Sequence, residues 1–163
     1  MTIESPVKAG IAHWFPGATG IDSLSQLSGG ASQETWSFDV LHPSGNIAVI
    51  LRRAPAGYGA APGRAAGLEA EAVLMRQAYE AGIPSPRVRY VLRAEDNLGS
   101  GFIMDRVEGE TIPRKILRDA QFAQARDVLA GQLGKVIAGI HALDRARLPK
   151  LRLMTVAGEL DDL

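Results

Sequence analysis

The 163-residue sequence contains no cysteine, which excludes disulfide bonds, zinc–thiolate sites and a cysteine nucleophile. It also carries no net charge, because 18 Lys and Arg residues balance 18 Asp and Glu residues, so no positive field is present to collect nucleic-acid phosphates. No apolar run approaches the roughly 20 residues that span a bilayer, and the N-terminus lacks the apolar stretch of a signal peptide. We therefore expect a cytoplasmic protein that binds neither nucleic acid nor membrane.

Apolar residues are plentiful by contrast, at 46 % of the sequence against 22 % charged residues. This composition supports one packed domain and argues against disorder, which requires low hydrophobicity and high net charge. Hydrophobic periodicity and turn residues predict both strands and helices, with an Ala-, Gly- and Pro-rich loop over 54–67. The expected strands are 23–27, 35–41, 47–51, 88–92 and 101–107, and the expected helices are 4–15, 68–81, 113–117 and 122–143.

Five strands with one helix inserted after the third match the small lobe of kinase-like phosphotransferases. Four segments carry a more specific resemblance, in matching order and spacing: 27–32 (Leu-Ser-Gly-Gly-Ala-Ser), 49–53 (Val-Ile-Leu-Arg-Arg), 71–86 and 101–109. Over about residues 21–145 the sequence resembles the N-terminal portion of the aminoglycoside phosphotransferase (choline kinase-like) family. Its Leu-Arg-Arg segment is similar to the matching segment in the branch of this family that is associated with acyl-CoA dehydrogenases.

The resemblance implies an α+β fold. The expected architecture is a protein kinase-like N-lobe, with a five-stranded antiparallel sheet and an inserted helix, followed by the first helices of an incomplete C-lobe. The nucleotide-binding N-lobe would cover residues 1–107, including the N-terminal helix, and the hinge with a truncated helical C-lobe would cover 108–163. The implied activity is ATP-dependent phosphorylation of a hydroxyl group on a small-molecule alcohol.

The glycine-rich segment is the first candidate site. Gly29 and Gly30 allow a tight turn whose backbone N–H groups can approach an anion, although a plain hairpin turn is the commoner reason for two glycines. A Walker loop is excluded, because no Gly-Lys-Ser/Thr sequence follows. The resemblance implies that the ATP phosphates lie against this segment, which comprises Ser28, Gly29, Gly30, Ala31 and Ser32.

Arg52 ends a buried strand at the position where kinases place a phosphate-binding lysine. An arginine keeps the charge and can bind phosphate oxygens through two nitrogens. We expect its neighbour Arg53 to face solvent. A one-residue error in the expected register would exchange the roles of Arg52 and Arg53. Glu71 lies on an apolar stripe of its helix, where a carboxylate needs a cation as partner, and the resemblance implies that this cation is Arg52. The alternative for Glu71 is a solvated residue near the helix start, as we expect for Glu69.

Residues 104–107 end the fifth strand. In the family the matching segment is the hinge between lobes, whose backbone binds the adenine edge. The resemblance therefore implies that the carbonyl of Asp105 and the N–H of Val107 contact the base, with Met104 lining the pocket. Without the resemblance, the segment is a strand that ends at a glycine turn.

The family takes its base and Mg²⁺ ligands from a His-x-Asp-x-x-x-x-Asn loop and a later Asp, and the sequence has no counterpart of this loop. We therefore assign no catalytic residue and no metal ligand, and we expect Mg²⁺ only together with the missing C-lobe.

Two functions remain open. In the first, the chain is the N-terminal part of an ATP-dependent phosphotransferase, inactive alone, whose reading frame continues past Leu163 with the missing loop. In the second, it is a stand-alone non-catalytic module that binds a nucleotide or a protein. A generic α+β domain without ATP would require all four matches to be coincidental. In either of the first two, we expect the apolar face of the helix over 122–143 to be exposed and to promote self-association.

Overall fold

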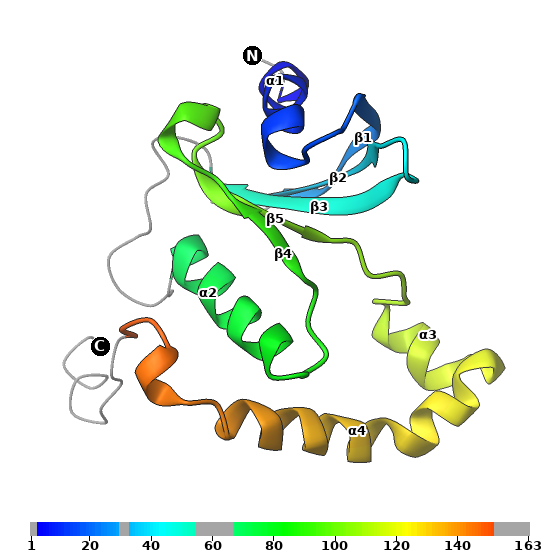
Figure 1. The fold of residues 1–163 in the computed structure, drawn as a ribbon. Coiled ribbons are helices and arrows are strands. Elements are labelled where there is room, and N and C mark those ends of the chain that lie inside the picture. Colours follow the sequence, from blue (N-terminus) through cyan, green and yellow to red (C-terminus); the bar gives the residue numbers. More distant parts are fainter. Residues whose placement is uncertain (1–2, 30–32, 55–66, 152–163) are drawn as a thin grey trace, which may run out of the picture.

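The computed structural model describes residues 3–29, 33–54 and 67–151. It shows a five-stranded antiparallel sheet, with strand order β1-β2-β3-β5-β4, that has α1 on one face and α2 on the other (Figure 1). This α+β architecture, with α2 inserted after the third strand, is the one that the sequence predicts. The strands are β1 (Gly20–Gly29), β2 (Glu34–Leu41), β3 (Ile47–Ala54), β4 (Val88–Val91) and β5 (Ser100–Asp105), and the helices are α1 (Glu4–Trp14), α2 (Gly67–Glu80), α3 (Pro113–Arg118) and α4 (Ala123–His141).

Long-range pairing, which a local pattern cannot show, sets the ends of two strands. β3 continues past its expected end at Leu51, because its antiparallel ladder with β5 runs on until Ala54 pairs with Ser100. β5 ends at Asp105, two residues earlier than expected. Of the loop expected over 54–67, residues 55–66 lie outside the described part of the chain.

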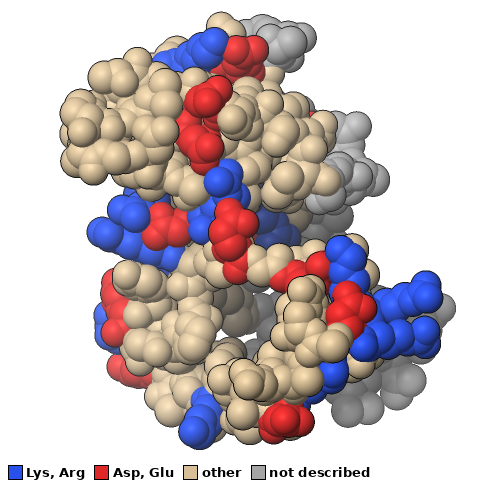
Figure 2. All heavy atoms as spheres, turned by 90° about the vertical axis from the view of Figure 1, so that its right-hand side faces the viewer, with Lys and Arg blue, Asp and Glu red and all other residues tan. Residues whose placement is uncertain are grey.

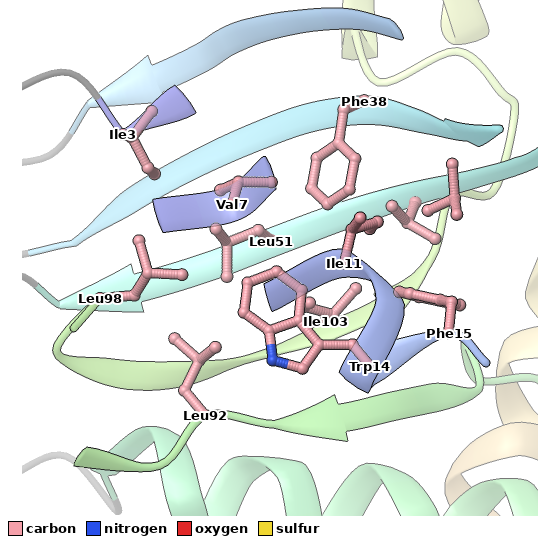
Figure 3. Packing of buried hydrophobic residues seen from close by; sticks show 12 residues of the cluster. Ile3, Val7, Ile11, Trp14, Phe15, Phe38, Leu51, Leu92, Leu98 and Ile103 are labelled. Atoms are coloured by element: carbon pink, nitrogen blue, oxygen red, sulfur yellow. The ribbon is translucent and has the colours of Figure 1, made fainter. Parts of the chain in front are cut away.

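The larger core lies between α1 and the sheet (Figure 3). Alternate residues along a strand point to the same face, and this alternation buries Phe38, Leu51 and Ile103 completely against α1. Val7 and Ile11, one turn apart on α1, complete the contact from the other side. Burial of each large apolar side chain contributes roughly 1.5–3 kcal/mol, so this layer anchors the fold.

Trp14 fastens the end of α1 to the connection between β4 and β5. Its indole Nε1 donates a hydrogen bond to Asp96 Oδ1 at 2.9 Å, although the two residues are 82 positions apart in the sequence. Gly10 makes room for the indole, since a Cβ atom at that position would collide with the ring. The other carboxylate oxygen of Asp96 accepts a hydrogen bond from the backbone N–H of Arg93 at 2.7 Å. The carboxylate therefore holds its own turn and the N-terminal helix together.

α2 packs on the opposite face over a smaller core. Leu68 and Ala72 of the helix are buried against Ala54, Val88 and Phe102 of the sheet. Gly82 ends the helix region in the left-handed conformation, with φ +74°, where a side chain would be strained.

α4 lies below α2 and keeps its apolar side chains accessible (Figure 1). Leu133 is 52 % exposed and Ile140 is 47 % exposed, which agrees with the expectation of an open apolar face on this helix. The end of α4 approaches the α2–β4 connection, where a Cβ atom on Gly139 would lie 3.1 Å from Ile83 Cγ1. Arg147, just beyond the helix, forms an ion pair with Glu80 at 2.9 Å. Within the described ranges, no helix combines the length and the apolar character needed to cross a membrane.

Gly101 allows β5 to approach β3 at the two arginines of the candidate site. A Cβ atom at Gly101 would lie 2.9 Å from Arg53 Cα and closer still to the carbonyl oxygen of Arg52. Because these are backbone atoms, we expect Gly101→Ala to lower the free energy of unfolding by about 1–3 kcal/mol, measured by urea unfolding. Gly109→Ala is the control, since nothing lies within 4 Å of its added Cβ atom. Equal effects of the two substitutions would contradict the tight contact.

Candidate functional site

Arg52 and Glu71 form the ion pair between β3 and α2 that the sequence predicts. Arg52 Nη1 lies 2.5 Å from Glu71 Oε1, and Arg52 Nη2 donates a hydrogen bond to Gln33 Oε1 at 2.8 Å. The two charged side chains are 35 % and 32 % exposed, respectively. The pair is therefore fixed in place by protein contacts and still reachable by a ligand.

Strand and helix periodicity bring these two side chains together. On β3, Arg52 shares the α2 side of the sheet with Ala54, which belongs to the α2 core. On α2, Glu71 directly precedes the fully buried Ala72, so its carboxylate starts close to the sheet, while Glu69 is exposed, as expected.

The pairing of β1 with β2 brings Ser28, in the first part of the glycine-rich segment, to the level of Arg52. Ser28 pairs with Thr35, which pairs in turn with Arg52 across the next strand. Gly29 continues β1 and pairs with Glu34, whereas Gly30, Ala31 and Ser32 lie outside the described residues. Gln33, the first described residue after them, binds Arg52 and was not predicted, because a single glutamine after a turn has no distinctive pattern.

Arg53 points to the other face of the sheet, toward α1. Its Nε donates to Glu34 Oε2 at 2.9 Å and its Nη1 to the carbonyl oxygen of Leu98 at 2.9 Å. The side chain is only 16 % exposed, so the expectation of a solvent-facing Arg53 is wrong. β3 continues past Leu51 and keeps both arginines within the sheet. The structure therefore shows that Arg52, and not Arg53, forms the ion pair with Glu71.

The end of β5 presents a free backbone group. Met104 is half-buried and packs on the α2 core, and the carboxylate of Asp105 accepts hydrogen bonds from Arg89 at 2.6 and 3.2 Å. The backbone N–H of Arg106 donates to the carbonyl oxygen of Ala48 at 3.0 Å. In the part of the chain that the structure describes, the N–H of the next residue, Val107, makes no hydrogen bond.

The sequence model of the phosphotransferase enzyme family matches residues 23–163, which is most of the chain. The chain belongs to the phosphotransferase enzyme family. A search among curated proteins finds no match. The five-stranded sheet with its inserted helix is accordingly the kinase-like N-lobe of a phosphotransferase.

A third arginine of this phosphotransferase, Arg106, was not predicted as a site residue. It lies directly after β5 and reaches back across the sheet to β2, where its Nη1 donates to Ser37 Oγ at 3.0 Å. Only its position between Asp105 and Val107, the two residues that the resemblance implies contact the base, marks it in the sequence, because contacts through the backbone would place no demand on side-chain identity.

The described ranges hold no group of three or more His, Asp or Glu side chains arranged to bind a metal ion. The carboxylates at the site are instead used by arginines, as Glu71 is by Arg52 and Asp105 by Arg89. What this part of the phosphotransferase offers a ligand is therefore positive charge and backbone groups.

Glu34 has a lowered pKa in the phosphotransferase. Burial by itself raises the pKa of this carboxyl, but the hydrogen bonds from Trp36 and Arg53 and the charge of Arg53 together outweigh burial and bring it below its ordinary value of 4.5. A carboxyl whose pKa is lower in the folded state stabilises the fold above its unfolded pKa, and this contribution is lost as the pH falls through the folded pKa.

We expect Glu34→Gln to lower the free energy of unfolding by about 1–2 kcal/mol at pH 7, because the amide cannot replace the charged partner of Arg53. At pH 3, which lies below the ordinary pKa of 4.5, the difference from the native sequence should shrink, since the carboxyl of the unfolded chain is then protonated and part of its contribution to stability is lost. Urea unfolding at both pH values measures this, with the exposed Glu69→Gln as a control that should change neither value. A difference that persists undiminished at pH 3 would show that Glu34 acts without its charge.

Proposed function

We propose that this chain is the nucleotide-binding part of an ATP-dependent phosphotransferase that phosphorylates a hydroxyl group of a small molecule. The observation that carries the proposal is the Arg52–Glu71 ion pair, held at the level of a glycine-rich hairpin. We further propose that the protein belongs to the aminoglycoside phosphotransferase (choline kinase-like) branch, close to the group associated with acyl-CoA dehydrogenases, and that it is cytoplasmic.

Arg52 is the proposed phosphate ligand. Glu71 holds one of its terminal nitrogens, and the other is occupied by the neutral amide of Gln33. A phosphate oxygen is a stronger acceptor for a guanidinium than an amide oxygen is, so ATP can displace Gln33 without breaking the ion pair. Backbone N–H groups of the segment from Ser28 to Ser32 are the proposed second set of phosphate donors.

The base is proposed to bind at residues 104–107. The N–H of Val107 is free to donate to a ring nitrogen, the carbonyl of Asp105 would accept from the exocyclic amine, and Met104 would line the pocket. This arrangement divides the chain, as a proposal, into an N-lobe over 1–107 and a hinge with helical segments over 108–163. The exposed apolar face of α4 is the proposed surface for self-association.

In the proposed reaction, the substrate hydroxyl oxygen attacks the γ-phosphorus, the bond to the ADP oxygen breaks, and the hydroxyl proton passes to a base. Mg²⁺ would neutralise charge on the phosphates. The 163 residues contain no His-x-Asp-x-x-x-x-Asn sequence, so we assign them neither the base nor the Mg²⁺ ligands. The alternative function is a non-catalytic module that binds a nucleotide or a protein.

We expect Arg52→Ala to weaken ATP binding by about 10- to 100-fold and to leave adenosine binding nearly unchanged, because the lost contact is made to phosphate. Titrations of both ligands followed by NMR measure the two affinities even where binding is weak. Glu71→Gln should weaken ATP binding less, and its matched control, Glu69→Gln on the exposed side of α2, should have no effect. Equal ATP affinity of Arg52→Ala and the native sequence would contradict the assignment of Arg52.

We also expect the 163-residue chain to release no ADP from ATP and Mg²⁺ in the presence of small alcohols, since it has no assigned base. A coupled assay for ADP measures this. Turnover that scales with protein concentration and persists through repeated purification would show that the chain holds a base that we have not assigned.

A further inference from the structure

Arg106 lies on the part of the sheet that α2 leaves uncovered. Along β5, Phe102 is buried under α2, Met104 lies at the margin of that core, and Arg106, two residues further on, follows on the same side beyond it. The guanidinium extends from the hinge segment to Ser37 and Asp39 of β2. Its place is therefore next to the backbone N–H of Val107 on the open half of this face.

Each nitrogen of the Arg106 guanidinium faces an oxygen atom. Nε donates to Glu108 Oε1 at 2.9 Å, Nη1 donates to Ser37 Oγ at 3.0 Å, and Nη2 lies 3.1 Å from Asp39 Oδ1. The Asp39 contact has ion-pair distance but not the alignment of a hydrogen bond. Because the N–H bonds of a guanidinium lie in its plane, the two hydrogen-bond partners, Glu108 and Ser37, lie along its edge and not over its faces.

The charge of Arg106 is neutralised locally. Two carboxylates, Asp39 and Glu108, share this one guanidinium, whereas Arg52 has one carboxylate and one neutral amide. A phosphate would meet net negative charge around Arg106, so its position does not suit an anion. A flat, uncharged ring does suit it, because a guanidinium held by its edge stacks on aromatic faces without losing its hydrogen bonds.

We propose that Arg106 is a base-binding residue, and that the purine ring of the nucleotide stacks on the face of its guanidinium. The side chain is 28 % exposed, so a ligand can reach part of it. The inference rests on the proposed function, since it places the base at residues 104–107, and it adds the planar surface against which the ring lies. Ser37 and Asp39 are positioning residues that hold the plane.

The test compares adenosine and ATP on the same variants of the 163-residue chain, with affinities from NMR titrations. Arg106→Met removes the plane and the charge, and Arg106→Lys keeps the charge and removes the plane. We expect both to weaken adenosine and ATP binding by a similar factor, about 3- to 30-fold, because the lost contact is with the base. Arg93→Met is the matched control, since Arg93 is 63 % exposed and pairs with Glu95, away from this face.

Three results would overturn the stacking role. Native affinity of Arg106→Lys would show that charge, not the plane, is required. Tighter adenosine binding by Arg106→Met would show that the side chain occupies the space of the base. If Ser37→Ala, which removes one edge bond and keeps the plane, reproduced the full loss, Arg106 would be only a tether between β2 and the hinge.

The same titrations separate this inference from the function on which it rests. If the native chain binds ATP and Arg52→Ala weakens that binding, while both Arg106 variants bind both ligands as the native chain does, only the stacking role fails. If the native chain binds neither ATP nor adenosine, the proposed function fails and the stacking role fails with it.

Discussion

The alternation of side chains along β3 places Arg52 and Arg53 on opposite faces of the sheet, and the rest of the molecule is arranged around this separation. β3 is paired on both edges, with β2 and with β5, so neither arginine can exchange places with the other without a shift of both ladders. Gly101 allows the approach of β5 at this point. As a result, Arg53 lies on the α1 side of the sheet and is largely buried, whereas Arg52 lies on the α2 side and is partly exposed.

Several of the opposite charges that balance in this protein also meet in the structure. Arg52 with Glu71, Arg53 with Glu34, and Arg89 with Asp105 each join two different elements of secondary structure. Pairs that are about one-third exposed or less are screened less by solvent than surface pairs are, and each fixes a geometry as well as neutralising a charge. Three arginines at or beside the candidate site differ in their partners: Arg53 is largely buried, Arg52 contacts one carboxylate and one amide, and Arg106 contacts two carboxylates and a hydroxyl.

Much of the fold could be predicted because it depends on local periodicity. The strand alternation around Phe38, the helix that contains Ala72 and the proline at the start of α3 all appear in the sequence, and the order of elements then suggests the sheet. The Arg52–Glu71 pair could be predicted as well, because an acidic residue on an apolar stripe requires a partner and the family resemblance indicates Arg52. Strand ends could not be predicted, since they are set by ladders between residues far apart in the chain.

The side-chain partners that the sequence did not reveal are Gln33 and the contacts of Arg106. Gln33 and Arg106 are single polar residues, and their partners depend on the positions of their backbones in the fold. No spacing rule in the sequence predicts those positions. The burial of Arg53 could not be predicted from the sequence either. A basic residue at an expected strand end indicates solvent exposure, but this strand continues, and two acceptors, Glu34 and the carbonyl of Leu98, draw the side chain inward.

The hydrogen bond from Trp14 to Asp96 has a consequence for synthesis on the ribosome. α1 is made first, yet the carboxylate that fixes its end is made 82 residues later, and the strand that fills the floor of its core, β5, follows after that. Non-local contacts of this kind form late, because the chain between them must be ordered first. The apolar side of α1, with Val7 and Ile11, therefore remains without its complete cover in a nascent chain until β5 has been made.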